Sequence, residues 1–354
     1  MPNANGGQAA TLNDVARLAN VSRQTVSRVI NNKAAVSPDT EQRVRAAIAE
    51  LDYRPNSHAR SLVTNRSLVL GLVVPSISQP YYPEIARGVE DGADEADYSV
   101  FLSHTGGDPA RELRTLERLR DQRVDGVIIC NSRLDDDELM HATSALSPVV
   151  LVNRRVPHAS GTVIWMGYES GTVLAIAHLN ALGRRRIAYL GYNYANRVDA
   201  ARFRGYQTAL QQVGIRFDAS LVFRGGNSFQ GGYDAMGLFH ASGNEIDGLF
   251  ASNDMMAIGA MRYALTHGID VPGELAIVGF GGSDITSMVT PDLTTVSMPL
   301  YSIGITAVQE LLQLLNGTSE QHRQLNIEPE ILVRGSSVAN MDPSDLLTRG
   351  GKEE

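Results

Sequence analysis

Residues 12–31 read LNDVARLANVSRQTVSRVIN, and this stretch decides the fold of the first part of the chain. Its apolar residues recur at helical spacing in two sets, which predicts two short helices joined by a sharp turn. Asn20 stands between the sets, and asparagine tolerates the left-handed backbone that such a corner requires. The small side chain of Ala16 lets the helices cross closely, and Ser22 is placed to cap the second helix. We therefore expect a helix-turn-helix.

The face of the second helix that is not needed for packing carries polar and basic residues. These are the types that hold phosphates and contact base edges in DNA grooves. The alternative is that they only solvate the outer face of a helical hairpin. The residues are Arg23, Gln24, Ser27, Arg28 and Asn31.

The segment that follows favours DNA binding. Residues 37–41, SPDTE, are a strong helix start, with a serine cap, a proline at the first helical position and acids in the first turn. Val44, Ile48 and Leu51 then share one face, which suits a third helix that closes a small domain. Pro55 ends this helix, and Asn56 can cap one more short helix, SHARSLVTN.

Residues 11–62 resemble the headpiece of the LacI/GalR family of bacterial transcription factors. SRQTVSRVINN corresponds to the family's recognition helix and DYRPNSHARSL to its hinge helix. The resemblance implies that Arg23, Gln24 and Arg28 enter the major groove and that Leu62 wedges into the minor groove, although Leu62 could instead be a core leucine. The DNA-binding residues that we expect are Ser22, Arg23, Gln24, Thr25, Ser27, Arg28, Asn31, Asn56, Ala59 and Leu62.

The charge of this 354-residue chain is unevenly distributed. Residues 1–66 hold nine Lys and Arg against five Asp and Glu, a balance of +4. Because the net charge of the whole chain is −8, the remaining residues carry −12. A basic headpiece on an acidic body confines phosphate attraction to one end.

The sequence also bears on where the protein acts. The start MPNANGGQAA has no signal-peptide pattern, no apolar run is long enough to span a membrane, and Cys130 is the single cysteine. We expect a cytoplasmic protein in which Cys130 is a buried apolar residue.

From residue 68 onward, short apolar strands alternate with amphipathic helices. The alternation predicts an α/β core of two doubly wound, parallel-sheet lobes. The resemblance continues to about residue 338 and implies a periplasmic-binding-protein-like architecture, with the ligand held between the lobes and chain crossovers near residues 166, 297 and 325. The strands that we expect are LVLGLVV, SVFLSH, GVIIC, VVLVN, VIWM, IAYLG, GLFAS and LAIVGF.

The patterns and the family resemblance together imply five segments. They are a disordered tail over 1–10, an all-α helix-turn-helix domain over 11–55, a hinge helix and linker over 56–67, a two-lobed effector-binding and dimerisation domain over 68–338, and a disordered tail over 339–354. The last segment lacks the heptads of a tetramerising coil, so we expect a homodimer on a pseudo-palindromic operator.

Candidate effector residues lie at strand ends, where open parallel sheets present backbone amides and helix N-termini. Tyr81 and Tyr82 could equally be core residues, and Asp254 could only cap a helix. The segment ANRVDAARFRGY contains Arg202. The family resemblance implies that Arg202 binds ligand oxygens through the planar, forked set of N–H donors of its guanidinium. The residues that we expect at the effector are Ser76, Tyr81, Tyr82, His104, Asn131, Asn153, Arg154, Arg202, Asn253, Asp254 and Gly281.

Two departures from the family affect the choice of ligand. Family members commonly carry an aspartate where VGFGGSD places Gly281, and an acid or amide where this chain has Met166 and Gly167. Stacking surfaces could come instead from Trp165, Tyr168, Tyr194 and Phe229. Aromatics combined with Asn, Asp and Arg suit clusters of hydroxyl groups, so a sugar is the expected effector. A purine-type corepressor is the alternative.

No enzyme motif stands out in the sequence. There is no phosphate loop, HExxH, CxxC or GxSxG pattern, and the eight histidines show no metal-ligand spacing. We therefore expect a repressor without enzymatic activity, cofactor or metal. A solute-binding protein of a transport system would share the two lobes, but it needs export and has no use for a DNA-reading headpiece.

Overall fold

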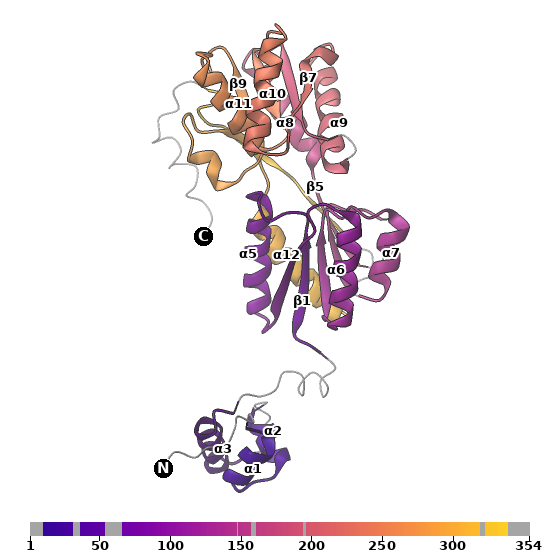
Figure 1. The fold of residues 1–354 in the computed structure, drawn as a ribbon, viewed down its shortest axis with the longest axis vertical. Coiled ribbons are helices and arrows are strands. Elements are labelled where there is room, and N and C mark those ends of the chain that lie inside the picture. The colour runs from indigo at the N-terminus through magenta and orange to yellow at the C-terminus, as the bar shows by residue number, and fades with distance from the viewer. Residues whose placement is uncertain are drawn as a thin grey trace. The chain divides into compact units, whose positions relative to one another are not determined.

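The structure, a computed structural model, describes residues 10–30, 36–53, 66–146, 148–156, 161–193, 196–318 and 323–338. The chain divides into two compact units, Met1–Ser67 and Leu68–Glu354 (Figure 1). The expected tails, apart from residue 10, and the expected hinge helix, apart from residues 66 and 67, lie outside the described residues. Among the described helices, none is long and apolar enough to cross a membrane.

The first unit is a three-helix domain of α1 (Leu12–Leu18), α2 (Arg23–Ile30) and α3 (Pro38–Glu50). Thr11 and Asp14 form a capping box on α1, and the Ser37 side chain caps α3. Asn20 has a φ of 53°, so the predicted left-handed corner is confirmed. The apolar residues expected on the three helices form one core: Val15, Ala16, Ala19, Val26, Val29, Val44 and Ala47 are buried, with Leu12, Ile48 and Leu51 packed against them.

The second unit contains two six-stranded sheets, each the centre of one lobe. In lobe 1 the strand order is β11-β5-β4-β3-β1-β2 and all pairs are parallel. In lobe 2 the order is β12-β10-β9-β8-β6-β7, and β12 is antiparallel to β10. The strands are β1 (Val69–Val74), β2 (Ser99–His104), β3 (Gly126–Cys130), β4 (Val149–Val152), β5 (Thr162–Met166), β6 (Ile187–Gly191), β7 (Val222–Arg224), β8 (Gly248–Ala251), β9 (Ala276–Gly281), β10 (Thr294–Ser297), β11 (Gln324–Ile327) and β12 (Glu330–Leu332).

Helices cover both faces of each sheet (Figure 1). One core lies beneath α6 and α7 in lobe 1, a second beneath α10 and α11 in lobe 2, and a third runs through both lobes on the side of α5, α12, α8 and α9. The helices are α5 (Tyr81–Asp94), α6 (Pro109–Asp121), α7 (Asp136–Ser144), α8 (Tyr168–Ala181), α9 (Arg197–Gln212), α10 (Phe229–Ala241), α11 (Asp254–Thr266) and α12 (Leu300–Leu315).

The chain passes between the lobes three times. It leaves lobe 1 after β5, returns after β10 to form α12 against α5, and crosses again between β11 and β12. These places match the crossovers expected near residues 166, 297 and 325. Two glycines allow α5 and α12 to pack closely, because a Cβ on Gly88 would collide with the Tyr301 carbonyl oxygen and one on Gly304 with that of Ile85.

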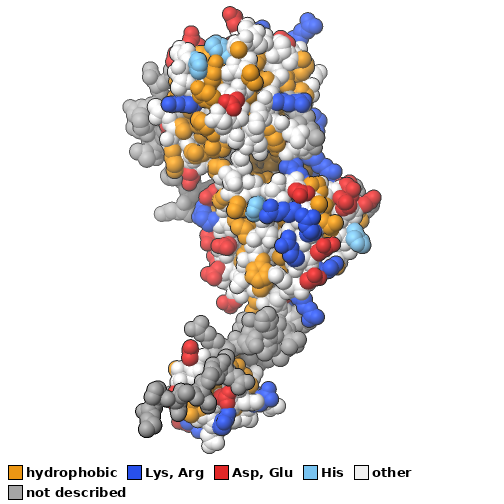
Figure 2. Space-filling view, viewed as in Figure 1, with side chains coloured by type: hydrophobic (Ala, Val, Ile, Leu, Met, Phe, Trp, Pro, Cys, Tyr) orange, Lys and Arg blue, Asp and Glu red, His pale blue; other side chains and the backbone are white. Residues whose placement is uncertain are grey.

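The predicted two-lobed α/β core is confirmed, and each of the eight expected strands is present. The sequence analysis missed β7, β10, β11 and β12, which have only three or four residues each. The visible face of the second unit carries acidic and basic side chains on both lobes (Figure 2).

Candidate functional site

The outward face of α2 is the candidate nucleic-acid interface. Val26 and Val29 anchor the helix in the core, which leaves Arg23, Gln24 and Arg28 exposed to solvent. Ser22 caps the helix by accepting a hydrogen bond from the Thr25 backbone at 3.1 Å. Asn31, Asn56, Ala59 and Leu62 lie outside the described residues.

The arginines of the headpiece fall into two groups. Arg17 is paired with Asp14 on α1, while Arg43 and Arg45 on α3 are paired with Asp39 at 3.4 Å and Glu41 at 2.7 Å. Arg23 and Arg28 on α2 make no ion pair with any described residue. Their guanidinium groups can therefore meet phosphates or bases without first breaking an internal pair.

A cavity of about 620 Å³, counted with its opening to solvent, lies between lobes 1 and 2. Both lobes supply its wall, at the ends of strands and the first turns of helices, which is where open α/β sheets bind ligands. Seven of the expected effector residues line it: Tyr81, Tyr82, Asn131, Arg202, Asn253, Asp254 and Gly281.

Phenol groups from both sides of the first crossover form one part of the wall. The hydroxyls of Tyr81 and Tyr168 are 2.9 Å apart, and the Asn153 amide donates to the Tyr168 hydroxyl at 2.8 Å. Asn153 does not line the cavity, so it acts from behind to position these rings. Burial raises the pKa values of Tyr81 and Tyr168, which keeps both phenols neutral.

Arg202 on α9 is the most unusual residue of the cavity. Its side chain is buried, with 6% of the residue exposed, and its guanidinium carbon lies 4.5 Å from the centre of the Tyr168 ring and 4.4 Å from that of Phe280. No described residue forms an ion pair with it, and its Nε has no hydrogen-bond partner. A buried N–H group without an acceptor is costly, so Arg202 is a candidate for binding a ligand oxygen.

The Asp254 carboxylate lies beside Gly281, the position at which the family resemblance places an acid. Gly281 has a φ of 143°, and a Cβ there would lie 2.8 Å from the Asp254 carboxylate. That carboxylate, at the start of α11, occupies the space beside the glycine. It accepts from Ser283 at 3.1 Å and Thr295 at 2.5 Å, and burial raises its pKa. Asp254 is therefore not the cap of α11, a role that Asn253 fills; its carboxylate ties α11 to β10 and to the loop after β9.

Amide side chains line the remaining wall. Asn253 caps α11 and donates to the Asn227 side chain at 2.8 Å, and the Gln79 side chain donates across the cavity to the Asn227 carbonyl at 2.8 Å. Asn131 donates to the Tyr82 hydroxyl at 2.9 Å, but its own Oδ1 is buried without a partner. These groups suit a ligand rich in hydroxyls.

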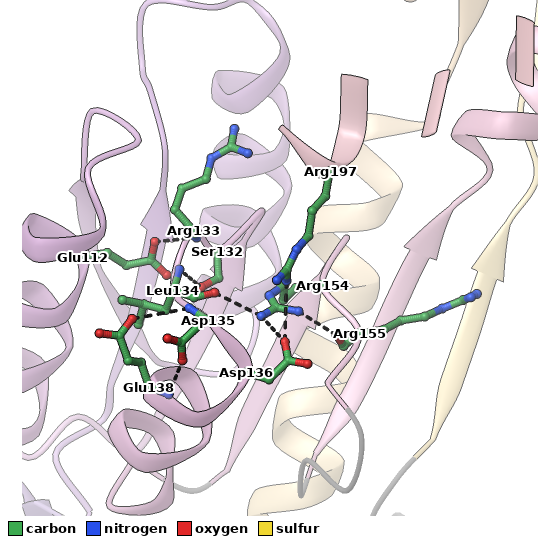
Figure 3. Close-up of polar contacts among 10 residues, drawn as sticks. All are labelled: Glu112, Ser132, Arg133, Leu134, Asp135, Asp136, Glu138, Arg154, Arg155 and Arg197. Atoms are coloured by element: carbon green, nitrogen blue, oxygen red, sulfur yellow. Dashed lines mark hydrogen bonds and ion pairs between the residues drawn. The ribbon is translucent and has the colours of Figure 1, made fainter. Parts of the chain in front are cut away.

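Four expected effector residues do not line the cavity: Ser76, His104, Asn153 and Arg154. Ser76 turns its hydroxyl to the Ser78 backbone, and His104 is exposed at the end of the edge strand β2. Arg154 is committed elsewhere, because its guanidinium reaches Asp136 at 2.5 Å and the Leu134 carbonyl at 3.0 Å (Figure 3).

Of the expected stacking surfaces, Tyr168 lines the cavity, whereas Trp165 and Phe229 do not. Trp165 lies instead beneath the Arg155 guanidinium, 4.2 Å from ring centre to Cζ, and Phe229 packs against the core of lobe 2. Tyr194 lies outside the described residues.

The sequence analysis missed several lining residues, among them Gln79, Arg133, Tyr192, Asn227 and Ser283. Tyr192 follows β6 directly and Arg133 lies three residues after the end of β3, so extending the rule that pointed to Asn131 would have found them. Asn227 follows β7, a strand that was not predicted.

Two protein-family models match the chain. The model described as bacterial regulatory proteins of the lacI family matches residues 11–56, and that of a periplasmic binding protein-like domain matches residues 176–337. The HTH-type transcriptional regulator RegA of Clostridium saccharobutylicum is 34% identical to the chain, covering 93% of the chain and 100% of RegA.

Solved structures agree with this match. A lac repressor dimer bound to operator and the anti-inducer ONPF has a TM-score of 0.85 and 30% identity, over 94% of this chain and 100% of the repressor chain. The transcriptional regulator CelR in complex with cellobiose has a TM-score of 0.71 and 30% identity, over 93% and 100% of the two chains. A helix-turn-helix headpiece, a two-lobed core and full-length similarity together show that this chain belongs to the LacI family of bacterial regulatory proteins.

Proposed function

We propose that the protein is a transcriptional repressor that binds a pseudo-palindromic operator as a homodimer and responds to a small carbohydrate in the inter-lobe cavity. As a LacI-family member it is a DNA-binding transcriptional regulator. The observation that carries the proposal is the outward face of α2, which exposes Arg23, Gln24 and Arg28 with no acidic partner among the described residues. We further propose that it acts in the cytoplasm, where operator DNA lies, and has no enzymatic activity.

The base-reading role of α2 follows from its chemistry. Arginine forms two parallel hydrogen bonds to guanine in the major groove, and glutamine can do so to adenine. We assign base contacts to Arg23, Gln24 and Arg28. Ser22, Thr25, Ser27 and Asn31 are assigned to the flanking phosphates, and Asn56, Ala59 and Leu62 to the minor groove.

The dimer is supported by the lac repressor relative, which is solved as a dimer on its operator. One headpiece reads a single half-site, so two-fold protein symmetry requires a two-fold symmetric operator. The carbohydrate is supported by the CelR–cellobiose relative and by the amide side chains of the cavity. Asn131, Arg202 and Asn253 are assigned to ligand oxygens, and Tyr81, Tyr82, Asp254 and Gly281 to the shape of the wall.

A selection from a random DNA library with the full-length protein tests the DNA-binding role. We expect enrichment of sequences with two inverted half-sites. The double variant Arg23→Ala/Arg28→Ala should then bind the selected site at least about 30-fold more weakly, because each bidentate base contact contributes about 1 to 3 kcal/mol.

The matched control is Arg43→Ala/Arg45→Ala, which removes the same charge from the same domain but from arginines already paired on α3. This variant should lose less than about tenfold. Equal losses in the two double variants would show that α2 contributes only general attraction to phosphates. Enrichment of a single asymmetric half-site would contradict the dimer.

A further inference from the structure

We propose that the ligand of the cavity is an anionic carbohydrate, whose phosphate or carboxylate is held between Arg133 of lobe 1 and Arg202 of lobe 2. This inference rests on the proposed function of the cavity as the effector site. It narrows the ligand from any sugar to one that carries a negative charge.

The N–H groups of the Arg202 guanidinium are open to a ligand. The Tyr168 and Phe280 rings lie against the group at 4.5 Å and 4.4 Å, and because their centres are 5.6 Å apart they pack beside one another and do not enclose it from both faces. The Nε at its edge is buried without an acceptor. An oxyanion accepts two parallel hydrogen bonds from such an edge, which is the strongest geometry available to arginine.

Arg133 brings a second cation to the same cavity. It follows β3, and its backbone N–H, rather than its side chain, donates to Glu112, at 2.9 Å. Figure 3 shows the Arg133 side chain extending away from Glu112 and from Asp136. Its guanidinium makes no ion pair with a described residue.

Tyr192, which follows β6, lines the cavity together with both arginines. Burial raises the pKa of Tyr192, while the guanidinium groups of Arg202 and Arg133 act in the opposite direction on the same phenol. The cavity therefore receives one arginine from each lobe. The Tyr192 hydroxyl already accepts a hydrogen bond from Asn196 at 2.6 Å and can donate to an oxyanion.

The acids near the cavity are hydrogen-bonded to other groups. Asp254 is the one carboxylate among the lining residues that the structure describes, and it accepts from Ser283 and Thr295. Asp199, buried on α9, acts to raise the pKa of Arg202 but accepts its hydrogen bonds from Tyr189, Tyr192 and Asn193. Within the described part of the chain neither acid forms an ion pair with Arg133 or Arg202, so a phosphate or carboxylate would give both guanidinium groups an acceptor.

The rest of the wall favours a sugar as the carrier of that charge. Gln79, Asn227 and Asn253 present amides, and Asn131 keeps an unpaired acceptor for a hydroxyl. The ligand class that fits both the two arginines and these amide side chains is therefore a sugar phosphate or a sugar acid.

Inorganic phosphate tests the anion site without knowledge of the natural ligand. The melting temperature of the full-length protein is measured against increasing sodium phosphate, with sodium chloride at matched ionic strength as reference. We expect a saturable rise of about 2 to 4 °C in the parent protein. Arg133→Gln and Arg202→Gln should each lose it, whereas Arg114→Gln, an exposed arginine on α6, should keep it.

Phosphate also stabilises proteins in general, and that effect would appear equally in all four proteins. An equal rise in all of them, or none beyond chloride, would overturn the proposal. Because no DNA is present, this result is independent of operator binding. A protein that binds phosphate through both arginines but selects no DNA would contradict only the proposed function.

Matched pairs of compounds then identify the source of the charge. Glucose is compared with glucose 6-phosphate, ribose with ribose 5-phosphate, and galactose with galacturonate, in the same melting assay. A response to phosphorylated members alone indicates a sugar phosphate, and one to galacturonate alone a sugar acid. A response to a neutral sugar that survives in Arg133→Gln and Arg202→Gln would contradict the anionic site.

Discussion

Replacing Arg154 with methionine should destabilise the second unit, whereas the same change at Arg197 should not. Both arginines reach the Asp136 carboxylate, Arg154 at 2.5 Å and Arg197 at 3.6 Å (Figure 3). They differ in burial, since 4% of the Arg154 side chain is exposed and 57% of the Arg197 side chain. The pair therefore compares a buried and an exposed cation on one shared acid.

The magnitude follows from the hydrogen bonds that are lost. The Arg154 guanidinium donates to the Arg155 carbonyl at 2.8 Å, to the Leu134 carbonyl at 3.0 Å and to Asp136. At about 1 kcal/mol net for each bond, Arg154→Met should lower the free energy of unfolding by about 3 kcal/mol. An exposed ion pair contributes about 0 to 1 kcal/mol, so Arg197→Met should lie within that range.

Thermal unfolding of the full-length variants measures the difference. We expect a fall in melting temperature of about 6 °C or more for Arg154→Met and of no more than about 3 °C for Arg197→Met. The phosphate-dependent rise should persist in both variants, because neither arginine lines the cavity. Equal falls would refute the reasoning from burial. An Arg154→Met protein with a normal melting temperature but no phosphate response would make Arg154 a ligand-binding residue.

Three further predictions concern the operator and the cavity. Gln24→Ala should relax the preference for one base in each half-site, by about 1 to 3 kcal/mol, in a randomised-operator selection in which Gln42→Ala on α3 behaves as the parent. Leu62→Ala should reduce operator affinity and the bend angle measured by gel mobility, while dimerisation measured by gel filtration stays intact. Gly281→Asp should lower the melting temperature, since its Cβ would lie 2.8 Å from the Asp254 carboxylate at a φ of 143°, and it would place two acids together.

The elements with strong periodic patterns could be predicted from the sequence. The caps at Ser22 and Ser37 and the corner at Asn20 are local features, so their signals lie in a few neighbouring residues. Strand β1 was found because it is a continuous apolar run. By contrast, β11 alternates exposed and half-buried residues and depends on its pairing with β5 from a distant part of the chain. No local pattern reveals such a strand.

The candidate site could be predicted in part, because strand ends can be located but side-chain direction cannot. Asn131 and Asn153 both follow buried strands and both have positive φ values. The first faces the cavity, while the second turns behind it to hold Tyr168. Arg154 also follows a buried strand, but its side chain donates to Asp136 at the start of α7. A rule that considers only the ends of strands cannot predict this partner.

The proposed anion site explains how a small ligand can act on the whole second unit. Contacts between the two lobes include a hydrogen bond from Gln79 to Asn227 and the 3.6 Å pair of Arg197 with Asp136, and both are polar and exposed. An oxyanion between Arg133 and Arg202 adds charge-assisted bonds to both lobes at once. Each is worth about 1.5 to 3 kcal/mol, which shifts an equilibrium between two lobe arrangements by about 10- to 150-fold. The ligand therefore favours the arrangement of the lobes in which both arginines reach it. Operator affinity rises if the DNA-bound headpieces require that arrangement and falls if they require the other one.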